Sequence, residues 1–127
     1  MKVIGLDGNE YNWKPASTHG KRSELHSKGV KVLESLFPHD NIIQEVPLAG
    51  TGKNPLRADV YLPNRNLIVE IHGEQHFKFV KFYHSTKANF MRAKARDVKK
   101  AEWCEINQIR LVAFNFDETE EEWRDKI

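Results

Sequence analysis

The sequence has a single cysteine, Cys104, and therefore no second thiol with which it could pair. An intramolecular disulfide is impossible, and so is a zinc site built from several thiolates. Long hydrophobic runs are also absent, since no apolar stretch approaches the roughly 20 residues of a membrane-spanning helix. Nothing in the first residues resembles the apolar segment of a secretory signal. These absences predict a cytoplasmic protein without membrane contact, whose metal ligands would be Asp, Glu or His.

The chain lacks a strong net charge, because 20 Lys and Arg residues face 18 Asp and Glu residues, a balance of +2. The charges are unevenly distributed, however. Residues 72–100 contain eight basic residues and two acidic ones, whereas residues 117–127 contain six acidic residues and two basic ones. The first region is suited to contact phosphate groups and the second is not. The length of 127 residues, 39% of them hydrophobic, predicts one domain with one modest core.

Hydrophobic spacing predicts an α/β sandwich around a central mixed four-stranded sheet flanked by helices. Residues 1–21 form a polar arm without a predicted regular structure, and residues 22–127 form the domain. Helices are expected at residues 23–37, 88–106 and 118–127, and strands at residues 42–48, 57–62, 67–72 and 109–114. The second and third strands are spaced for an antiparallel hairpin. The helix at 88–106 has a thin apolar stripe, Met91, Ala95, Val98 and Ala101, on a basic surface.

Two carboxylates and a histidine mark the expected hairpin as the chemical centre. Glu70 and His72 are two residues apart in one strand and therefore project from the same face. Asp59, near the start of the partner strand, converges with them if the hairpin pairs as expected. Two carboxylates brought together repel each other unless a cation lies between them, and oxygen ligands suit Mg²⁺ or Mn²⁺. The sequence therefore predicts a divalent metal site at this hairpin.

A metal ion beside histidines suggests phosphodiester hydrolysis. The ion can polarise a phosphate and lower the pKa of a bound water molecule. His72, and His76 four residues later, titrate near neutrality and can transfer protons to or from the reacting oxygens. Basic side chains around the expected site would hold the flanking phosphates of DNA. They are Arg57, Lys78, Lys81, Lys94, Arg96, Lys99 and Lys100.

The motif Arg57-Ala58-Asp59, ten residues, then Glu70-Ile71-His72 resembles the Asp-x10-Glu-x-Lys pattern of the PD-(D/E)xK nuclease superfamily. His72 stands in the lysine position. The longer string RADVYLPNRNLIVEIHGEQHF is similar to the very short patch repair endonuclease branch, with its relatives among phage and homing endonucleases. The resemblance implies a restriction-endonuclease-like fold and a DNA endonuclease of a bacterial or phage-infected cell.

The resemblance also implies roles for single residues. Asp59 matches the central metal ligand, with Glu70 and the backbone carbonyl of Ile71 as co-ligands of Mg²⁺ or Mn²⁺. His72 matches the catalytic histidine and His76 resembles the second one. Two further acidic residues complete the implied catalytic set, Glu24 in the first helix and Asp97 in the second.

Each of these residues also has an ordinary structural interpretation. Asp59 can cap a strand, and Glu70 can form a buried ion pair with a lysine or arginine. The two histidines can be core or turn residues, and Glu24 can pair with Lys28 along its helix. Asp97 can pair with neighbouring basic residues on a solvated face. A zinc site made of His72, His76, His84 and Cys104 is a further possibility, although its spacing follows no standard pattern.

The predicted function is a metal-dependent DNA endonuclease, and the resemblance implies that it leaves 5′-phosphate and 3′-hydroxyl ends. With one site per chain, a monomer would nick one strand, whereas double-strand cleavage would require a homodimer or two successive events. A separate DNA-targeting partner is also compatible with so small a chain. Two alternatives stay open: a non-catalytic nucleic-acid-binding module, which the missing lysine favours, and a structure-specific nuclease for branched DNA.

Overall fold

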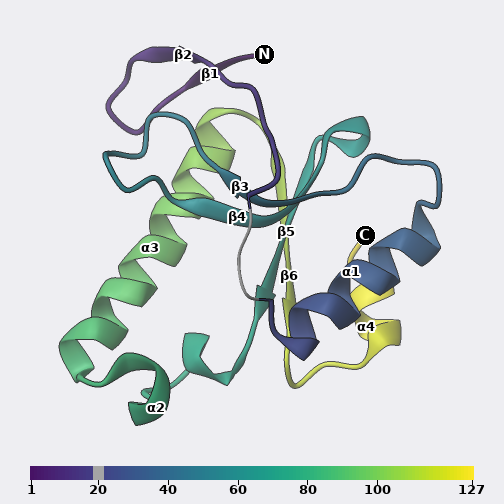
Figure 1. Ribbon diagram of the computed structural model, residues 1–127, viewed down its shortest axis with the longest axis vertical. Helices are drawn as coiled ribbons and strands as arrows, with labels where there is room; N and C mark the ends of the chain where they lie inside the picture. The colour runs from purple at the N-terminus through teal and green to yellow at the C-terminus, as the bar shows by residue number, and fades with distance from the viewer. Residues whose placement is uncertain (19–21) are drawn as a thin grey trace.

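A computed structural model describes residues 1–18 and 22–127, apart from the side chains of residues 82 and 83. It shows a mixed sheet with α3 on one side and α1 and α4 on the other (Figure 1). The elements are β1 Lys2–Ile4, β2 Glu10–Asn12, α1 Glu24–Leu36, β3 Ile43–Pro47, β4 Arg57–Leu62, the 3-10 turn η1 Pro63–Arg65, β5 Leu67–His72, the 3-10 turn η2 Glu74–His76, α2 Lys81–His84, α3 Lys87–Ile106, β6 Arg110–Asn115 and α4 Glu120–Asp125. The predicted α/β sandwich is confirmed.

The central sheet has the order β3-β4-β5-β6, with β5 and β6 parallel and the other neighbours antiparallel. The predicted hairpin is present: Leu62 pairs with Leu67 and Val60 with Val69. Its turn contains Asn66 in a left-handed conformation, φ 52°, which asparagine tolerates better than most residues. The register of this hairpin places Asp59 opposite Glu70.

The segment expected to lack regular structure contains the hairpin of β1 and β2, and it packs onto the domain. Val3 and Trp13 are buried in the core beneath α3, where the Trp13 ring lies 5.0 Å from Trp103 and 4.9 Å from Tyr61. The indole nitrogen of Trp13 donates to the Pro47 carbonyl, 2.9 Å away. The predicted boundary between arm and domain falls between residues 21 and 22. Residues 19–21 lie outside the described part of the chain.

Helix α1 begins where the sequence predicts. Ser23 caps it, because its hydroxyl accepts from the His26 backbone N–H at 3.1 Å, and the pattern stops before Pro38. His26, Gly29, Val30 and Leu33 form the buried face. Ile71 packs so close to Gly29 that a Cβ there would lie 2.7 Å from its side chain. This close approach places the first turn of α1 over the end of β5.

Helix α3 is oriented differently from the expectation. Met91 and Val98, members of the expected apolar stripe, are 65% and 58% exposed. The face directed at the rest of the molecule contains Asp97 and Lys100 and, one turn later, the buried Trp103 and Cys104. Only the C-terminal end of the helix is anchored in the core, so its polar stripe is turned toward the sheet.

Large aromatic residues fill the core on both sides of the sheet. Trp103, Phe114 and Trp123 are fully buried, and the rings of Phe114 and Trp123 stack at 4.9 Å. The connection between β5 and α3 contains the turn η2 and the short helix α2. Helix α4 begins at a capping box formed by Thr119 and Glu122.

Within the described residues, no helix has the length and apolar character that crossing a membrane requires.

Candidate functional site

Asp59 and Glu70 bridge the two strands of the hairpin at the point where the backbone ladder ends. The Asp59 N–H donates to Glu70 Oε2, and the Ile71 N–H donates to Asp59 Oδ2, both at 2.7 Å. Each carboxylate thus accepts a hydrogen bond from a backbone N–H of the opposite strand. This bond stands where the next backbone–backbone hydrogen bond of the strand pair would otherwise form. The predicted convergence of these two residues is confirmed, and their positions are fixed by two backbone bonds.

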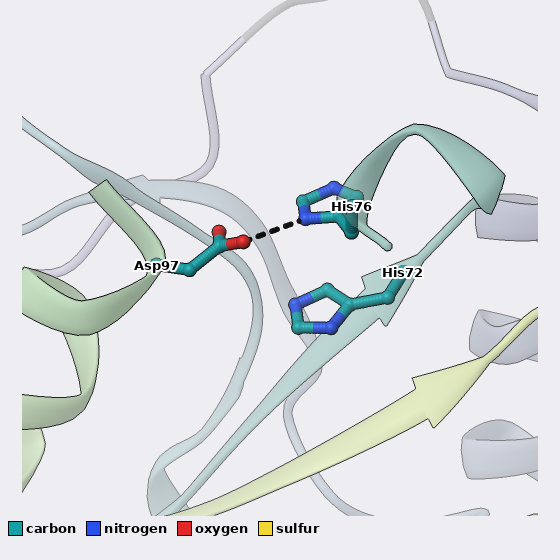
Figure 2. Close-up of side chains that lie close together, drawn as sticks. All are labelled: His72, His76 and Asp97. Atoms are coloured by element: carbon teal, nitrogen blue, oxygen red, sulfur yellow. Dashed lines mark hydrogen bonds and ion pairs between the residues drawn. The ribbon is translucent and has the colours of Figure 1, made fainter. Parts of the chain in front are cut away.

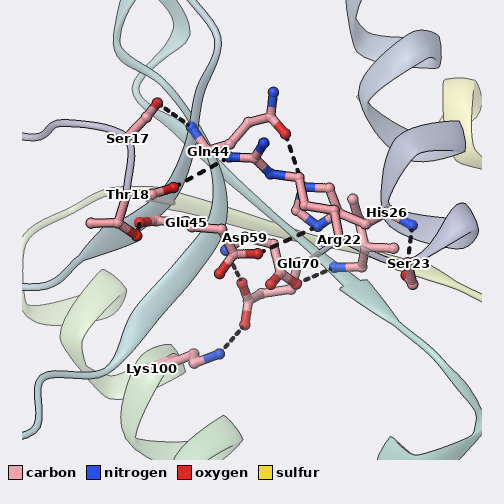
Figure 3. A network of polar contacts seen from close by, with 11 residues as sticks. Ser17, Thr18, Arg22, Ser23, His26, Gln44, Glu45, Asp59, Glu70 and Lys100 are labelled. Atoms are coloured by element: carbon pink, nitrogen blue, oxygen red, sulfur yellow. Dashed lines mark hydrogen bonds and ion pairs between the residues drawn. The ribbon is translucent and has the colours of Figure 1, made fainter. Parts of the chain in front are cut away.

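Glu70 forms a buried ion pair with Lys100 of α3. Lys100 Nζ lies 2.6 Å from Glu70 Oε1, and the two side chains are 16% and 4% exposed (Figure 3). Burial lowers the pKa of Lys100, but the charge and hydrogen bond of Glu70 outweigh burial, so the pKa is raised. The expected phosphate contact of Lys100 is therefore replaced by this ion pair. Both oxygens of Glu70 already have partners, which leaves it poorly placed as a metal ligand.

Two residues that the sequence analysis missed lie beside Asp59 instead. His26 reaches in from α1 and Glu45 from β3, and one donor atom of each lies within 4.8 Å of the others and of a carboxylate oxygen of Asp59. His26 Nε2 also contacts Gln44 Oε1 at 3.1 Å, and its Nδ1 lies 3.7 Å from Glu45 Oε1. We call His26, Glu45 and Asp59, with Glu70 and Lys100 below them, the carboxylate cluster.

Asp59 and Glu45 both show features unusual for acidic residues. Burial, and then the charge of Glu70, raise the pKa of Asp59 from 3.8 to about 8. Glu45 has a left-handed backbone conformation, φ 54°, which is uncommon outside glycine and asparagine and often occurs at functional sites. The only sequence signal for Glu45 is the polar pair Gln44-Glu45, which interrupts an otherwise apolar strand.

His72, His76 and Asp97 form a second group, which we call the histidine cluster. The imidazole rings of His72 and His76 stack with centroids 4.2 Å apart, and His76 Nδ1 lies 3.0 Å from Asp97 Oδ2. The three residues come from β5, η2 and α3, and their side chains face one another in Figure 2. The structure therefore brings together the two histidines and the helical aspartate that the sequence analysis singled out.

The electrostatics of the histidine cluster favour neutral His72 and ionised Asp97. Burial, and then the charge of His76, lower the pKa of His72. Burial raises the pKa of Asp97, but the hydrogen bond from His76 and the nearby positive charges outweigh it, so this pKa is lowered. The carboxylate can fix the orientation of the His76 ring through the 3.0 Å contact.

A small cavity of about 40 Å³ connects the two clusters. Glu70 and Lys100 line it from the carboxylate cluster, and His72 and Asp97 line it from the histidine cluster. This volume accommodates about one water molecule or one small ion. Because Asp97 and Lys100 are one turn apart on α3, the helix contributes one residue to each cluster.

Glu24 is not part of the site. Its side chain is exposed in the first turn of α1, where it lines a surface hollow with Arg22, Lys28 and Lys31. The physical reason is helical rotation, since each residue turns about 100° and Glu24 therefore projects away from His26. The structure therefore does not bring Glu24 together with the other predicted site residues, and the inward position in this turn belongs to His26.

The other predicted phosphate contacts lie on the surface. Lys78 pairs with Glu74 at 2.5 Å, and Lys94 donates to the His76 carbonyl at 2.6 Å. Phe77, half exposed, packs beside His72 and against the exposed Phe116, with ring centroids 5.8 Å apart. The other predicted phosphate contacts, all of them exposed, are Arg57, Lys81, Arg96 and Lys99.

The structure does not bring His84 and Cys104 together with His72 and His76, so the alternative zinc site is not assembled. Cys104 lies on the buried face of α3, in the core between this helix and the sheet, and burial raises its pKa to about 12. His84 packs against Phe90 and its Nδ1 accepts from the Val80 backbone N–H. In the described part of the chain, the groups with metal-binding spacing are the histidine cluster and the trio of His26, Glu45 and Asp59.

Comparison with known proteins gives two viral relatives. Uncharacterized protein 307L of Invertebrate iridescent virus 6 is 37% identical over 65 residues, which are 49% of this chain and 33% of that protein. Uncharacterized protein 033L of Invertebrate iridescent virus 3 is 37% identical over 62 residues, covering 49% of this chain and 31% of that protein. The matched segment thus spans about a third of the curated relatives. No protein-family model matches the chain, and no solved structure matches it.

Proposed function

We propose that the chain is a metal-dependent DNA endonuclease that hydrolyses phosphodiester bonds and leaves 5′-phosphate and 3′-hydroxyl ends. One observation carries the proposal: Asp59, whose pKa is about 8, lies within metal-binding distance of Glu45 and His26, next to a second group of two histidines and an aspartate. Burial and the neighbouring Glu70 disfavour the charged form of Asp59, which a bound cation would stabilise, and the adjacent histidines are side chains able to move protons. This combination suits metal-assisted hydrolysis.

The residues present fit Mg²⁺ or Mn²⁺, although with a different ligand set from the one expected. Asp59 and Glu45 supply carboxylate oxygens, which these ions prefer, and His26 supplies a nitrogen that Mn²⁺ also accepts. Glu70 is held by Lys100 and by the Asp59 backbone, and it keeps the strand end in place. A bound ion would polarise the phosphate and supply a nucleophilic water at neutral pH.

The protein's own residues would do the rest of the chemistry. Asp97 holds His76 by the 3.0 Å contact, which fixes the ring so that it can take a proton from water or give one to the leaving oxygen. His72 lies beside it, and its lowered pKa keeps it neutral and available as a base. Lys100 lines the cavity between the clusters, where its ion pair with Glu70 joins α3 to the end of β5.

The substrate follows from the charge around the site. Exposed basic residues surround the histidine cluster on α3 and α2, and Lys94 lies within 2.6 Å of the His76 carbonyl. Basic side chains on one surface provide contacts to successive phosphates of a nucleic acid. A monomer would nick one strand, and double-strand cleavage would require a homodimer or two successive events; a separate DNA-targeting partner would deliver the chain to its substrate. Its location in the cytoplasm of a bacterial or phage-infected cell stays a prediction.

The test is a nicking assay with purified protein and supercoiled plasmid in Mg²⁺, Mn²⁺ or EDTA. We expect metal-dependent conversion to nicked circles, lost in Asp59→Asn and retained in Asp125→Asn, a matched substitution of an exposed carboxylate in α4. DNA binding, measured by gel shift in Ca²⁺, should be equal in all three proteins.

Two results would redirect the proposal. Salt-sensitive DNA binding without cleavage of plasmid, mismatched or branched DNA would indicate the non-catalytic binding module. Cleavage confined to branched DNA would indicate a structure-specific nuclease with the same chemistry. Nicking by Asp59→Asn at the unvaried rate would contradict the assignment of the site.

A further inference from the structure

The histidine cluster has the composition of a transition-metal site. His72, His76 and Asp97 each offer one donor atom, and these atoms all lie within 4.8 Å of one another. Donors bound about 2.1 Å from a single ion are about 3–4 Å apart, so small side-chain rotations would suffice. The three residues come from three different elements, and none is adjacent to another in the sequence.

A second observation is independent of this spacing. His72 Nε2 is buried, and nothing in the described part of the chain lies within hydrogen-bonding distance of it. Buried polar atoms almost always have a partner, and those that do not call for an explanation such as a site for an ion or a water molecule. In Figure 2 the His72 ring lies beside the His76 ring and faces Asp97.

The backbone around the cluster is held in place before any ion binds. His72 ends β5, whose pairing with β6 continues to Asn115, and the Phe116 N–H donates to the His72 carbonyl at 2.9 Å. Lys94 Nζ donates to the His76 carbonyl at 2.6 Å. Asp97 lies in the middle of α3. Preorganised donors of this kind increase metal affinity because little chain entropy is lost on binding.

We infer that His72, His76 and Asp97 bind one divalent transition-metal ion of the Zn²⁺ and Co²⁺ class. Two imidazole nitrogens and one carboxylate suit these ions better than Mg²⁺, which prefers oxygen ligands. Three protein ligands leave an open coordination position for water. The site is distinct from the Mg²⁺ or Mn²⁺ position proposed at Asp59, and the two are separated by the ion pair of Glu70 and Lys100.

The inference does not depend on nuclease activity, but it has a consequence for that activity. The nitrogen lone pairs that would bind the ion are the ones needed for proton transfer in the proposed hydrolysis. Zn²⁺ at this site and proton transfer by His76 therefore exclude each other. If the protein is a nuclease, Zn²⁺ should inhibit nicking in excess Mg²⁺, and His39→Ala, an exposed histidine after α1, should be inhibited equally.

The direct test titrates Co²⁺ into untagged, EDTA-treated protein and records visible absorption. We expect one equivalent to produce bands far stronger than those of aqueous Co²⁺, and one equivalent of Zn²⁺ to remove them. His76→Ala and Asp97→Ala should weaken Co²⁺ affinity at least about 10-fold. His39→Ala and Asp59→Asn should bind Co²⁺ with the same affinity as the unvaried protein. Thermal melting in EDTA verifies that each variant is folded.

Absence of strong bands in the unvaried protein would overturn the inference. Equal loss in Asp59→Asn and His76→Ala would also overturn it, since the ion would then bind at the carboxylate cluster. If the alanine variants do not fold, ring-nitrogen NMR of the unvaried protein decides the matter. Zn²⁺ should shift the resonances of His72 and His76, and a shift of His26 alone, or of no histidine, would contradict the site.

Discussion

The carboxylate cluster and the histidine cluster both contribute residues to one small cavity, yet their charges are arranged in different ways. In the first, Lys100 neutralises Glu70, and Asp59 is left with a pKa of about 8 beside Glu45. In the second, Asp97 is ionised and its partner is the adjacent His76. The comparison shows that the carboxylate cluster requires an added cation to stabilise its negative charge. In the histidine cluster, Asp97 and His76 supply both the hydrogen-bond acceptor and the donor.

The first prediction breaks the carboxylate cluster by removing Lys100, the lysine that pairs with Glu70. Lys100→Met leaves Glu70 buried without its counterion, and such losses cost about 3–5 kcal/mol. We expect the free energy of unfolding to fall by this amount in urea denaturation. Lys99→Met, an exposed neighbour on the same helix, is the control and should change it by less than about 0.5 kcal/mol.

Combining Lys100→Met with Glu70→Gln should recover part of this loss, because no unpaired charge is then buried. If the single Lys100→Met protein is as stable as the unvaried one, the ion pair is not a structural element of the site.

The second prediction uses pH to sharpen the contrast. Because the folded pKa of Asp59 is raised from 3.8 to about 8, the folded protein retains a proton that the unfolded chain releases within this window. Asp59 therefore lowers stability as pH rises from 3.8 toward about 8, and its contribution is most favourable below that window. Asp59→Asn should gain stability over the unvaried protein by about 1 kcal/mol per pH unit between roughly pH 5 and 7.5 in EDTA.

Melting curves of the two proteins at matched pH measure that difference directly, since other titrating groups cancel. A difference that is constant with pH would show that Asp59 is ionised throughout and would remove the argument for a charge-deficient site.

The third prediction breaks the histidine cluster without touching the carboxylates. His76→Ala should lower the nicking rate about 100-fold if His76 transfers a proton, while the Mg²⁺ concentration for half-maximal activity stays the same. Single-turnover rates across a Mg²⁺ series provide both quantities, and His39→Ala is the control. A shifted Mg²⁺ requirement would instead place the working ion among the histidines.

The fourth prediction alters the carboxylate cluster and leaves the histidine cluster unchanged. Glu45→Gln should raise the Mg²⁺ concentration for half-maximal nicking about 10-fold, with recovery of the rate at high Mg²⁺, because one ligand is weakened rather than lost. Glu34→Gln, an exposed glutamate of α1, should leave the Mg²⁺ requirement unchanged. Unaltered Mg²⁺ dependence in Glu45→Gln would exclude Glu45 from the ligand set.

The smallest expected effect is that of Glu24→Gln. Because Glu24 faces the solvent on the side of α1 away from His26, nicking should change by less than about 2-fold. His26→Gln in the same turn should increase the Mg²⁺ requirement. A large loss in Glu24→Gln with an intact His26→Gln protein would restore the expectation from the sequence resemblance.

The sequence determined the local part of this arrangement. Two short segments rich in strand-forming residues and a four-residue connection predict the hairpin, and its register alone places Asp59 opposite Glu70. The spacing of Glu70 and His72 by two residues puts both on one face. Ser23 and Pro38 similarly define the ends of α1. These features depend on residues a few positions apart, whose geometry the backbone period fixes.

Only the tertiary structure decided which distant residues complete the site. The rotation of α1 selects His26 over Glu24, and the kinked strand β3 brings Glu45 to Asp59. The anchoring of α3 through Trp103 turns Lys100 toward Glu70 and leaves Met91 exposed. Helix rotation depends on the packing of large side chains from separate elements, among them Trp13 of the N-terminal segment. Sequence period alone indicates that a helix has faces, whereas long-range packing determines which face meets the sheet.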